Sequence, residues 1–150
     1  MTDKNWNIYL AGEIHSDWRD RIITGTEAKN LPITFSGPVT NHDASDLVGV
    51  NILGEEPQAF WQDRKGASIN AIRTANMINR ADVVVVRFGP KFKQWNAAFD
   101  AGYAAAMKKS LIILHEEEHN HALKEVDAAA NATARTPEQV VDILDYVLTA

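Results

Sequence analysis

The chain has 150 residues and a formal net charge of −5 at pH 7, with 45% hydrophobic residues, 23% charged residues and no cysteine. These values are typical of one globular domain, so we expect a single domain over residues 1–150. The negative net charge argues against a broad basic surface that binds nucleic acid. No apolar run approaches the roughly 20 residues that cross a membrane. A polar start without a signal-peptide pattern, together with the lack of cysteine, favours a cytoplasmic location.

The first half of the chain predicts two strands and one helix. Residues 7–12 form a short apolar run that ends at a glycine, which is typical of a buried strand. Ser16 is placed to cap a helix that starts in the next turn, and residues 31–35 predict a second strand. Residues 36–65 show no clear periodicity, and this length indicates a functional or partly helical segment.

The second half alternates helices and strands more regularly. Four consecutive valines within residues 82–88 indicate a strand that is covered on both faces. Thr136 and Pro137 are suited to the N-cap and the first position of the last helix. We expect helices over residues 67–80, 91–109, 122–130 and 137–148, and strands over residues 82–88, 111–114 and 132–134.

This alternation predicts an α/β fold with three layers, α/β/α. We expect a doubly wound, flavodoxin-like sheet of five parallel strands in the order 2-1-3-4-5. Ligands of such sheets bind beyond the carboxyl ends of the strands, at the point where the strand order reverses. Here that point lies between the first and third strands, where the loops after Gly12 and Gly89 face each other.

The helix that follows Gly89 carries one acidic residue, Asp100. Trp95, Phe99, Gly102 and Ala106 recur at helical spacing, so we expect them to form the buried stripe of this helix. Asp100 then flanks that stripe, and Asn96 lies four residues earlier, where its amide can orient the carboxylate. On spacing alone, a solvated helix aspartate is the commoner explanation for such a residue.

Three segments resemble the nucleoside 2-deoxyribosyltransferase superfamily in order and spacing: IYLAG at residues 8–12, ADVVVV at residues 81–86 and DAGYA at residues 100–104. More closely, the segments IYLAGEIHSDWR, GPVTNHDASD, ILGEEP and QWNAAFDAGYA resemble the YtoQ family over nearly the whole chain. Transferases of the superfamily attack the anomeric carbon with the glutamate of a Glu-x-Gly-Tyr-Ala motif and release the base. The resemblance therefore implies that Asp100 is the nucleophile of a retaining glycosyl transfer.

The same resemblance implies roles for Asp82 and Tyr9. Asp82 matches an acidic residue of the superfamily and would orient the substrate or manage the leaving base; the alternative is a strand-end aspartate that caps nearby backbone. Tyr9 matches an aromatic residue near the sugar, so its hydroxyl would help to hold Asp100; the alternative is packing at a strand end. Asp100 stands where the superfamily has its nucleophilic glutamate. Six positions earlier, where those transferases carry an acidic residue, this chain has Gln94. Both changes indicate an N-glycoside other than a strict deoxyribosyltransferase substrate.

The ligand is expected to contact residues in the loops around the point of strand reversal. These expected ligand-binding residues are Gly12, Glu13, His15, Gly37, His42, Asp43, Gly89, Gln94 and Asn96. Arg19 and Arg73 have the chemistry to grip a phosphate or carboxylate, although surface ion pairing is the commoner role. No cofactor and no metal are expected, because neither His42, Asp43 and Asp46 nor residues 116–121 define a coordination sphere.

The function predicted from these observations is cleavage or transfer at the N-glycosidic bond of a nucleoside or nucleotide-like small molecule. Two rivals stay open. One is a noncatalytic nucleotide-binding or sensing module that kept the pocket, and the other is an oligomeric scaffold with a vestigial pocket. The superfamily resemblance also implies a homo-oligomer.

Overall fold

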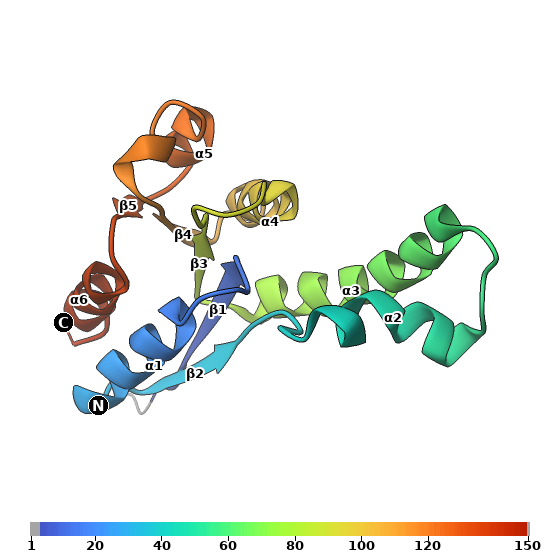
Figure 1. The fold of residues 1–150 in the computed structure, drawn as a ribbon. Helices are drawn as coiled ribbons and strands as arrows, with labels where there is room; N and C mark the ends of the chain where they lie inside the picture. Colours follow the sequence, from blue (N-terminus) through green and yellow to red (C-terminus); the bar gives the residue numbers. More distant parts are fainter. Residues whose placement is uncertain (1–3, 150) are drawn as a thin grey trace.

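The computed structural model describes residues 4–149, and its core is a five-stranded parallel sheet (Figure 1). The strands are β1 (Trp6–Gly12), β2 (Ile33–Ser36), β3 (Val83–Arg87), β4 (Ser110–Leu114) and β5 (Ala132–Ala134). Their order is β2-β1-β3-β4-β5, and all four neighbouring pairs run parallel. The predicted fold class and strand order are therefore confirmed.

Helices cover both faces of the sheet. They are α1 (Trp18–Ala28), α2 (His42–Leu53), α3 (Ala59–Arg80), α4 (Trp95–Ala106), α5 (Lys124–Ala128) and α6 (Pro137–Leu148), with a 3₁₀ turn at Glu117–His119. One apolar core lies between the sheet and α1 with α6, and it contains Ile8 and Leu10. The other core lies between the sheet and α3, α4 and the α5 region, and it contains Tyr9 and Ala11. Successive side chains of β1 thus enter opposite cores, as the two-residue period of a strand requires.

Residues 36–65, which show no periodicity in the sequence, contain α2 and the beginning of α3. Together α2 and the N-terminal part of α3, residues 42–66, form a helical arm that projects from the sheet (Figure 1). The Asn41 side chain caps α2 by accepting a hydrogen bond of 2.9 Å from the backbone N–H of Ala44. A Cβ atom on Gly49 would lie 2.4 Å from the Cβ of Lys65, so this glycine allows the two helices of the arm to touch.

Two of the helix predictions need correction. The N-cap of α1 is Asp17, and the hydroxyl of Ser16 instead donates a hydrogen bond of 2.6 Å to Glu13 Oε2. By contrast, Thr136 caps α6 as predicted, accepting from the backbone N–H of Gln139 at 3.2 Å. No helix of residues 4–149 is both long and apolar enough to cross a membrane.

The second correction concerns the buried face of α4. Ala97, Ala101 and Ala104 face the sheet, whereas Trp95 and Phe99 are 75% and 70% exposed. The physical reason is the close packing of α4 on the sheet, which leaves room for alanine methyl groups but not for large aromatic rings. Asp100 still flanks the buried stripe, because on the helix surface it lies next to the alanines that face the sheet as well as next to the stripe predicted from the sequence.

Candidate functional site

The loops after β1 and β3 meet closely at the predicted point of strand reversal. Gly12 has φ 104°, and a Cβ atom at this position would lie 2.2 Å from the carbonyl oxygen of Arg87. The backbone N–H of Glu13 donates to that same carbonyl at 3.0 Å. Only glycine adopts this conformation without strain and also allows the two strands to approach this closely.

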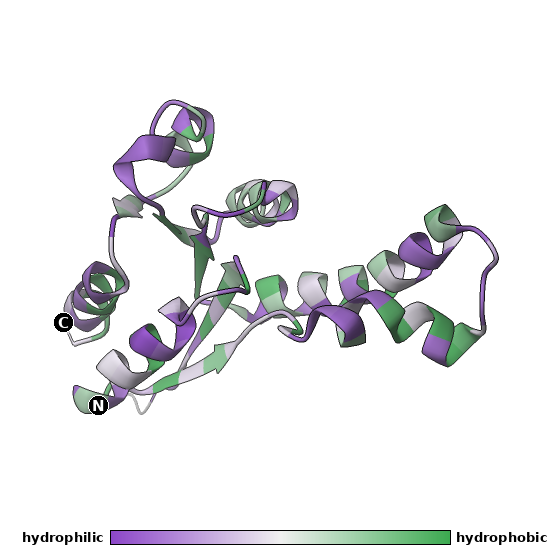
Figure 2. Ribbon diagram, in the orientation of Figure 1, coloured by the Kyte–Doolittle hydropathy of each residue, from purple (hydrophilic) through white to green (hydrophobic). Residues whose placement is uncertain are grey.

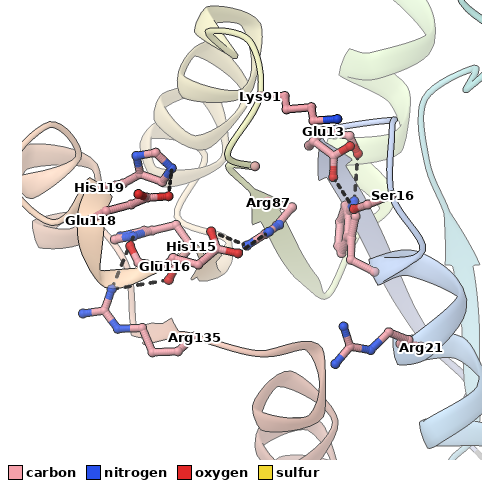
Figure 3. A network of polar contacts seen from close by, with 12 residues as sticks. Glu13, Ser16, Arg21, Arg87, Lys91, His115, Glu116, Glu118, His119 and Arg135 are labelled. Atoms are coloured by element: carbon pink, nitrogen blue, oxygen red, sulfur yellow. Dashed lines mark hydrogen bonds and ion pairs between the residues drawn. The ribbon is translucent and has the colours of Figure 1, made fainter.

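The Glu13 side chain is folded back into its own loop (Figure 3). It is only 4% exposed, and its carboxylate accepts hydrogen bonds from the hydroxyl of Ser16 and the backbone N–H of His15. A Cβ atom on Gly89 would come within 2.6 Å of the Glu13 Cγ. Glu13 therefore shapes the two loops, and its expected contact with the ligand stays a prediction.

Asp100 and Tyr9 lie together on the α4 side of the sheet. Burial raises the pKa of the Asp100 carboxyl to about 6. Burial, and then the nearby Asp100 charge, raises the pKa of the Tyr9 phenol to about 12, and a hydrogen bond with Thr74 works in the opposite direction. A half-buried carboxylate thus lies close to a phenol that stays neutral at physiological pH.

Arg19 and Arg73 bind backbone carbonyl groups near this pair. The Arg19 guanidinium donates to the carbonyls of Leu10, Gly12 and Glu13 at 3.1, 3.1 and 2.6 Å. Burial lowers the pKa of this guanidinium to about 10, so it stays cationic at neutral pH. Arg73 Nη1 donates to the carbonyl oxygen of Gly37 at 2.6 Å. Both arginines thus place positive charge beside the carboxyl end of β1, and within residues 4–149 neither forms the surface ion pair that was expected of it.

Gln94 fixes the loop after β3. Its Oε1 atom accepts from the backbone N–H of Gly89 at 2.9 Å, and its Nε2 atom donates to the carbonyl oxygen of Lys91 at 2.5 Å. Between these bonds Phe92 has φ 62°, and its ring lies 4.9 Å from the ring of His15. The Gln94 amide is therefore bonded within the loop, and its expected contact with the ligand stays a prediction. The rings of His15 and Phe92 form an aromatic rim.

Replacing Gln94 with alanine is expected to loosen this loop at a cost of about 1 kcal/mol, because the Gly89 N–H loses its acceptor. Amide hydrogen exchange, followed by NMR, should then speed up at Gly89. A matched control is Gln139→Ala, which removes the side chain that accepts from the Arg135 N–H at 2.6 Å. That variant should speed exchange at Arg135 and leave Gly89 unchanged. Unaltered exchange at Gly89 in Gln94→Ala would contradict the assigned role.

Several predicted site residues lie elsewhere or make other contacts. Asp82 precedes β3 at the amino edge of the sheet, where it accepts from the Asn7 N–H at 2.9 Å and pairs with Lys4 at 3.1 Å. This position lies at the opposite edge of the sheet from the loops after β1 and β3 and fits the strand-end alternative, and the substrate-orienting role stays a prediction. His42 and Asp43 are exposed in the first turn of α2, on the arm. Asn96 is exposed too, and within residues 4–149 it makes no hydrogen bond to Asp100.

A second polar network at the carboxyl edge was not anticipated (Figure 3). Arg87, the last residue of β3, pairs through both of its terminal nitrogens with Glu116, at 2.6 and 3.1 Å. Buried His115 contacts the Asp127 carboxylate at 2.9 Å through Nε2 and the carbonyl of Glu116 at 2.7 Å through Nδ1. This network ties β3, β4 and α5 together. The sequence signal for this network was Arg87, a charged residue at the end of an otherwise apolar strand.

The acidic turn of residues 116–119 brings possible metal ligands together. Side-chain ligand atoms of Glu116, Glu118 and His119 lie within 4.8 Å of one another. Both carboxylate oxygens of Glu116 already accept hydrogen bonds from Arg87. A cation at this position would have to displace the guanidinium, so the turn is explained by its ion pair.

Comparison with known proteins agrees with this architecture. The family model described as "Nucleoside 2-deoxyribosyltransferase YtoQ" matches residues 9–148. The "Uncharacterized protein YtoQ" of Bacillus subtilis (strain 168) is 49% identical over 140 residues, which cover 93% of this chain and 95% of that protein. The chain belongs to the YtoQ family. The predicted family membership is therefore confirmed.

Two solved structures share the fold at low sequence identity. A conserved protein from Enterococcus faecalis V583 has a TM-score of 0.65 at 14% identity, covering 97% of this chain and 100% of its own. A 2-deoxyribosyltransferase from Bacillus psychrosaccharolyticus has a TM-score of 0.57 at 14% identity, covering 91% of this chain and 90% of its own. At this identity the likeness establishes a nucleoside deoxyribosyltransferase-like fold.

Proposed function

We propose that this YtoQ-family chain cleaves or transfers the N-glycosidic bond of a nucleoside or nucleotide-like small molecule, with Asp100 as the nucleophile. The observation that carries the proposal is the half-buried Asp100 carboxylate beside the Tyr9 phenol, in the α4 layer next to the point of strand reversal. The family description and the deoxyribosyltransferase of similar fold support the reaction class.

In the proposed reaction a carboxylate oxygen of Asp100 attacks the anomeric carbon of the sugar. The C–N bond breaks, its electron pair leaves with the base, and the base takes up a proton. Water or a second acceptor then attacks the same carbon and frees the Asp100 carboxylate. With its pKa raised to about 6, this carboxylate is ionised at neutral pH yet more basic than an ordinary aspartate. The neutral Tyr9 hydroxyl would hold it in position.

The groups near Tyr9 and in the loops after β1 and β3 suit a polar sugar and a flat base. Arg19 and Arg73 hold positive charge at the carboxyl end of β1, and each guanidinium has N–H groups beyond those already bonded to carbonyls. The rings of His15 and Phe92 at the rim offer a stacking surface for a base, and His15 is the proposed donor of the proton to the leaving base.

The test is release of free base from a panel of nucleosides and nucleotides, followed by chromatography. We expect Asp100→Asn to reduce release at least about a thousandfold, since the variant keeps the shape of the side chain but removes the nucleophile. The matched control is Asp142→Asn, an exposed aspartate on α6, which should keep wild-type turnover. Wild-type turnover should fall as the pH drops below about 6, because Asp100 takes up a proton.

Two results of this test would contradict the proposal. Saturable binding of a nucleotide without base release from any substrate would contradict catalysis and favour a noncatalytic binding module. Base release that persists in Asp100→Asn would instead contradict the assignment of the nucleophile.

A further inference from the structure

The Asp100 carboxylate has no countercharge among residues 4–149. It forms no ion pair there, and burial alone accounts for the raised pKa of this carboxyl. The charges of Arg19 and Arg73 act elsewhere, since they oppose the rise in the pKa of the Tyr9 phenol. A half-buried negative charge without a partner costs free energy, and a positive group on a ligand would remove that cost.

The proposed chemistry decides where such a positive group would lie on a nucleoside-like substrate. The nitrogen of the base is bonded to the same anomeric carbon that the Asp100 oxygen attacks. Because an attacking oxygen starts about 3–3.5 Å from that carbon, a charge on the base ring lies roughly 5 Å from the carboxylate. At this separation, in a site with little water, opposite charges attract each other strongly.

The loops after β1 and β3 hold no buried proton donor for a leaving base among their described residues. The Glu13 carboxylate acts as an acceptor, from the Ser16 hydroxyl and a backbone N–H. The Gln94 amide is bonded at both of its ends within the loop. The titratable donors of these loops are all exposed to water: His15, Lys91 and Lys93. A base that needs a proton to leave is poorly served here, whereas a base that is already cationic leaves as a neutral molecule.

The aromatic rim offers a face for a cationic ring. Phe92 is 73% exposed, on a loop that Figure 2 shows as mostly hydrophilic, and its ring lies 4.9 Å from that of His15. Its φ of 62° is uncommon for a residue other than glycine, and the two hydrogen bonds of Gln94 enclose it. The face of such a ring attracts a flat cation, for example a pyridinium.

We propose that the substrate is the N-glycoside of a cationic aromatic base, such as a ribosylated pyridinium or a purine nucleoside alkylated at N7. This inference rests on the proposed function and names its substrate class. As the Asp100 oxygen bonds to the anomeric carbon, the electron pair of the C–N bond moves into the base ring and cancels its positive charge. The base departs without taking up a proton. Water then attacks the same carbon, gives its proton to solvent and frees the Asp100 carboxylate.

Guanosine and N7-methylguanosine are matched probes, since they share the sugar and the ring system and differ by one methyl group and one positive charge. Release of free base from each is divided by the rate at which that compound loses its base without protein. We expect the acceleration to be at least about a hundredfold greater for N7-methylguanosine, the scale of a missing general acid.

The possible failures of this comparison are distinguishable. Release from no nucleoside of the panel, these two included, would contradict the proposed function itself. Equal acceleration of the two probes, or cleavage of neutral nucleosides alone, would leave that function standing and overturn the cationic substrate class.

Binding tests the charge without the chemistry. Nicotinamide methylated on its ring nitrogen is a cation that carries no sugar to be cleaved, and nicotinamide itself is the neutral match. NMR titration of the wild type should give a Kd about tenfold lower for the cation. Asp100→Asn should abolish this preference, and the control Asp142→Asn, on the exposed side of α6, should keep it. Equal affinities in the wild type, or a preference that survives in Asp100→Asn, would overturn the inference.

Discussion

Replacing Gly12 with alanine is expected to destabilise the fold by about 3–5 kcal/mol, the largest effect on stability that we expect from a single methyl group. At φ 104° an L-residue is strained, and the new Cβ would lie 2.2 Å from the carbonyl oxygen of Arg87. That carbonyl cannot move away freely, because it also accepts the Glu13 N–H at 3.0 Å. The alanine variant must therefore separate β1 from β3 at the candidate site.

Urea unfolding of the wild type and the variant measures this cost. The matched control is Gly54→Ala, since Gly54 has a similar φ of 94° but a Cβ atom there would meet nothing within 4 Å. The control carries the conformational strain alone, about 1–3 kcal/mol. Equal costs for the two variants would show that the strands separate easily and that close approach does not explain the glycine.

The fold could be predicted because its strands carry unambiguous patterns. Residues 83–86 are all valine, and both their faces are buried, so the continuous apolar run identifies a central parallel strand. The weak fifth strand, Ala132–Ala134, follows from its place between two expected helices rather than from composition. Alternation of elements then favours parallel pairing, and the strand order is one of the common orders of doubly wound sheets.

The arm could not be predicted, for a physical reason. Helical periodicity appears when one face is buried and the other is in water. In α2 only Gly49 is fully buried, and large apolar residues remain exposed along the arm, so the chain shows no such contrast. The same reasoning explains the error in α4, where the periodic stripe exists but faces away from the sheet.

The candidate site could be predicted only in part. Asp100 and Tyr9 follow from the family resemblance together with the topology, and in the structure the Asp100 charge raises the pKa of the Tyr9 phenol. The contacts of Thr74 with Tyr9 and of Gln94 with Gly89 depend on how helices and loops pack in three dimensions. Glu13 shows this most clearly. Its loop position can be read from the sequence, but the hydrogen bond that its carboxylate accepts from the His15 backbone N–H cannot.

Replacing Asp100 with asparagine is expected to stabilise the fold while it removes the proposed activity. The folded-state pKa of this carboxyl is about 6, above its ordinary value of 3.8, because burial disfavours the charged form. Between these two pH values the folded protein holds more protons than the unfolded chain. The stability of the wild type therefore falls as the pH rises through this window, and it stays lower above it.

Asparagine cannot ionise, so the variant avoids this loss. Its gain over the wild type should be smallest near pH 4 and reach about 1–3 kcal/mol above pH 6, as judged from the size of the shift for a partly solvated group. Urea unfolding at pH 4 and pH 7.5 measures the difference, with Asp142→Asn as the exposed control that should show no such dependence. A gain that does not change with pH would mean that Asp100 is fully hydrated, and a hydrated carboxylate would lose its raised basicity as a nucleophile. Proteins often keep functional groups that lower their stability. The Asp100 carboxylate, which weakens the fold only when it is ionised, fits that pattern.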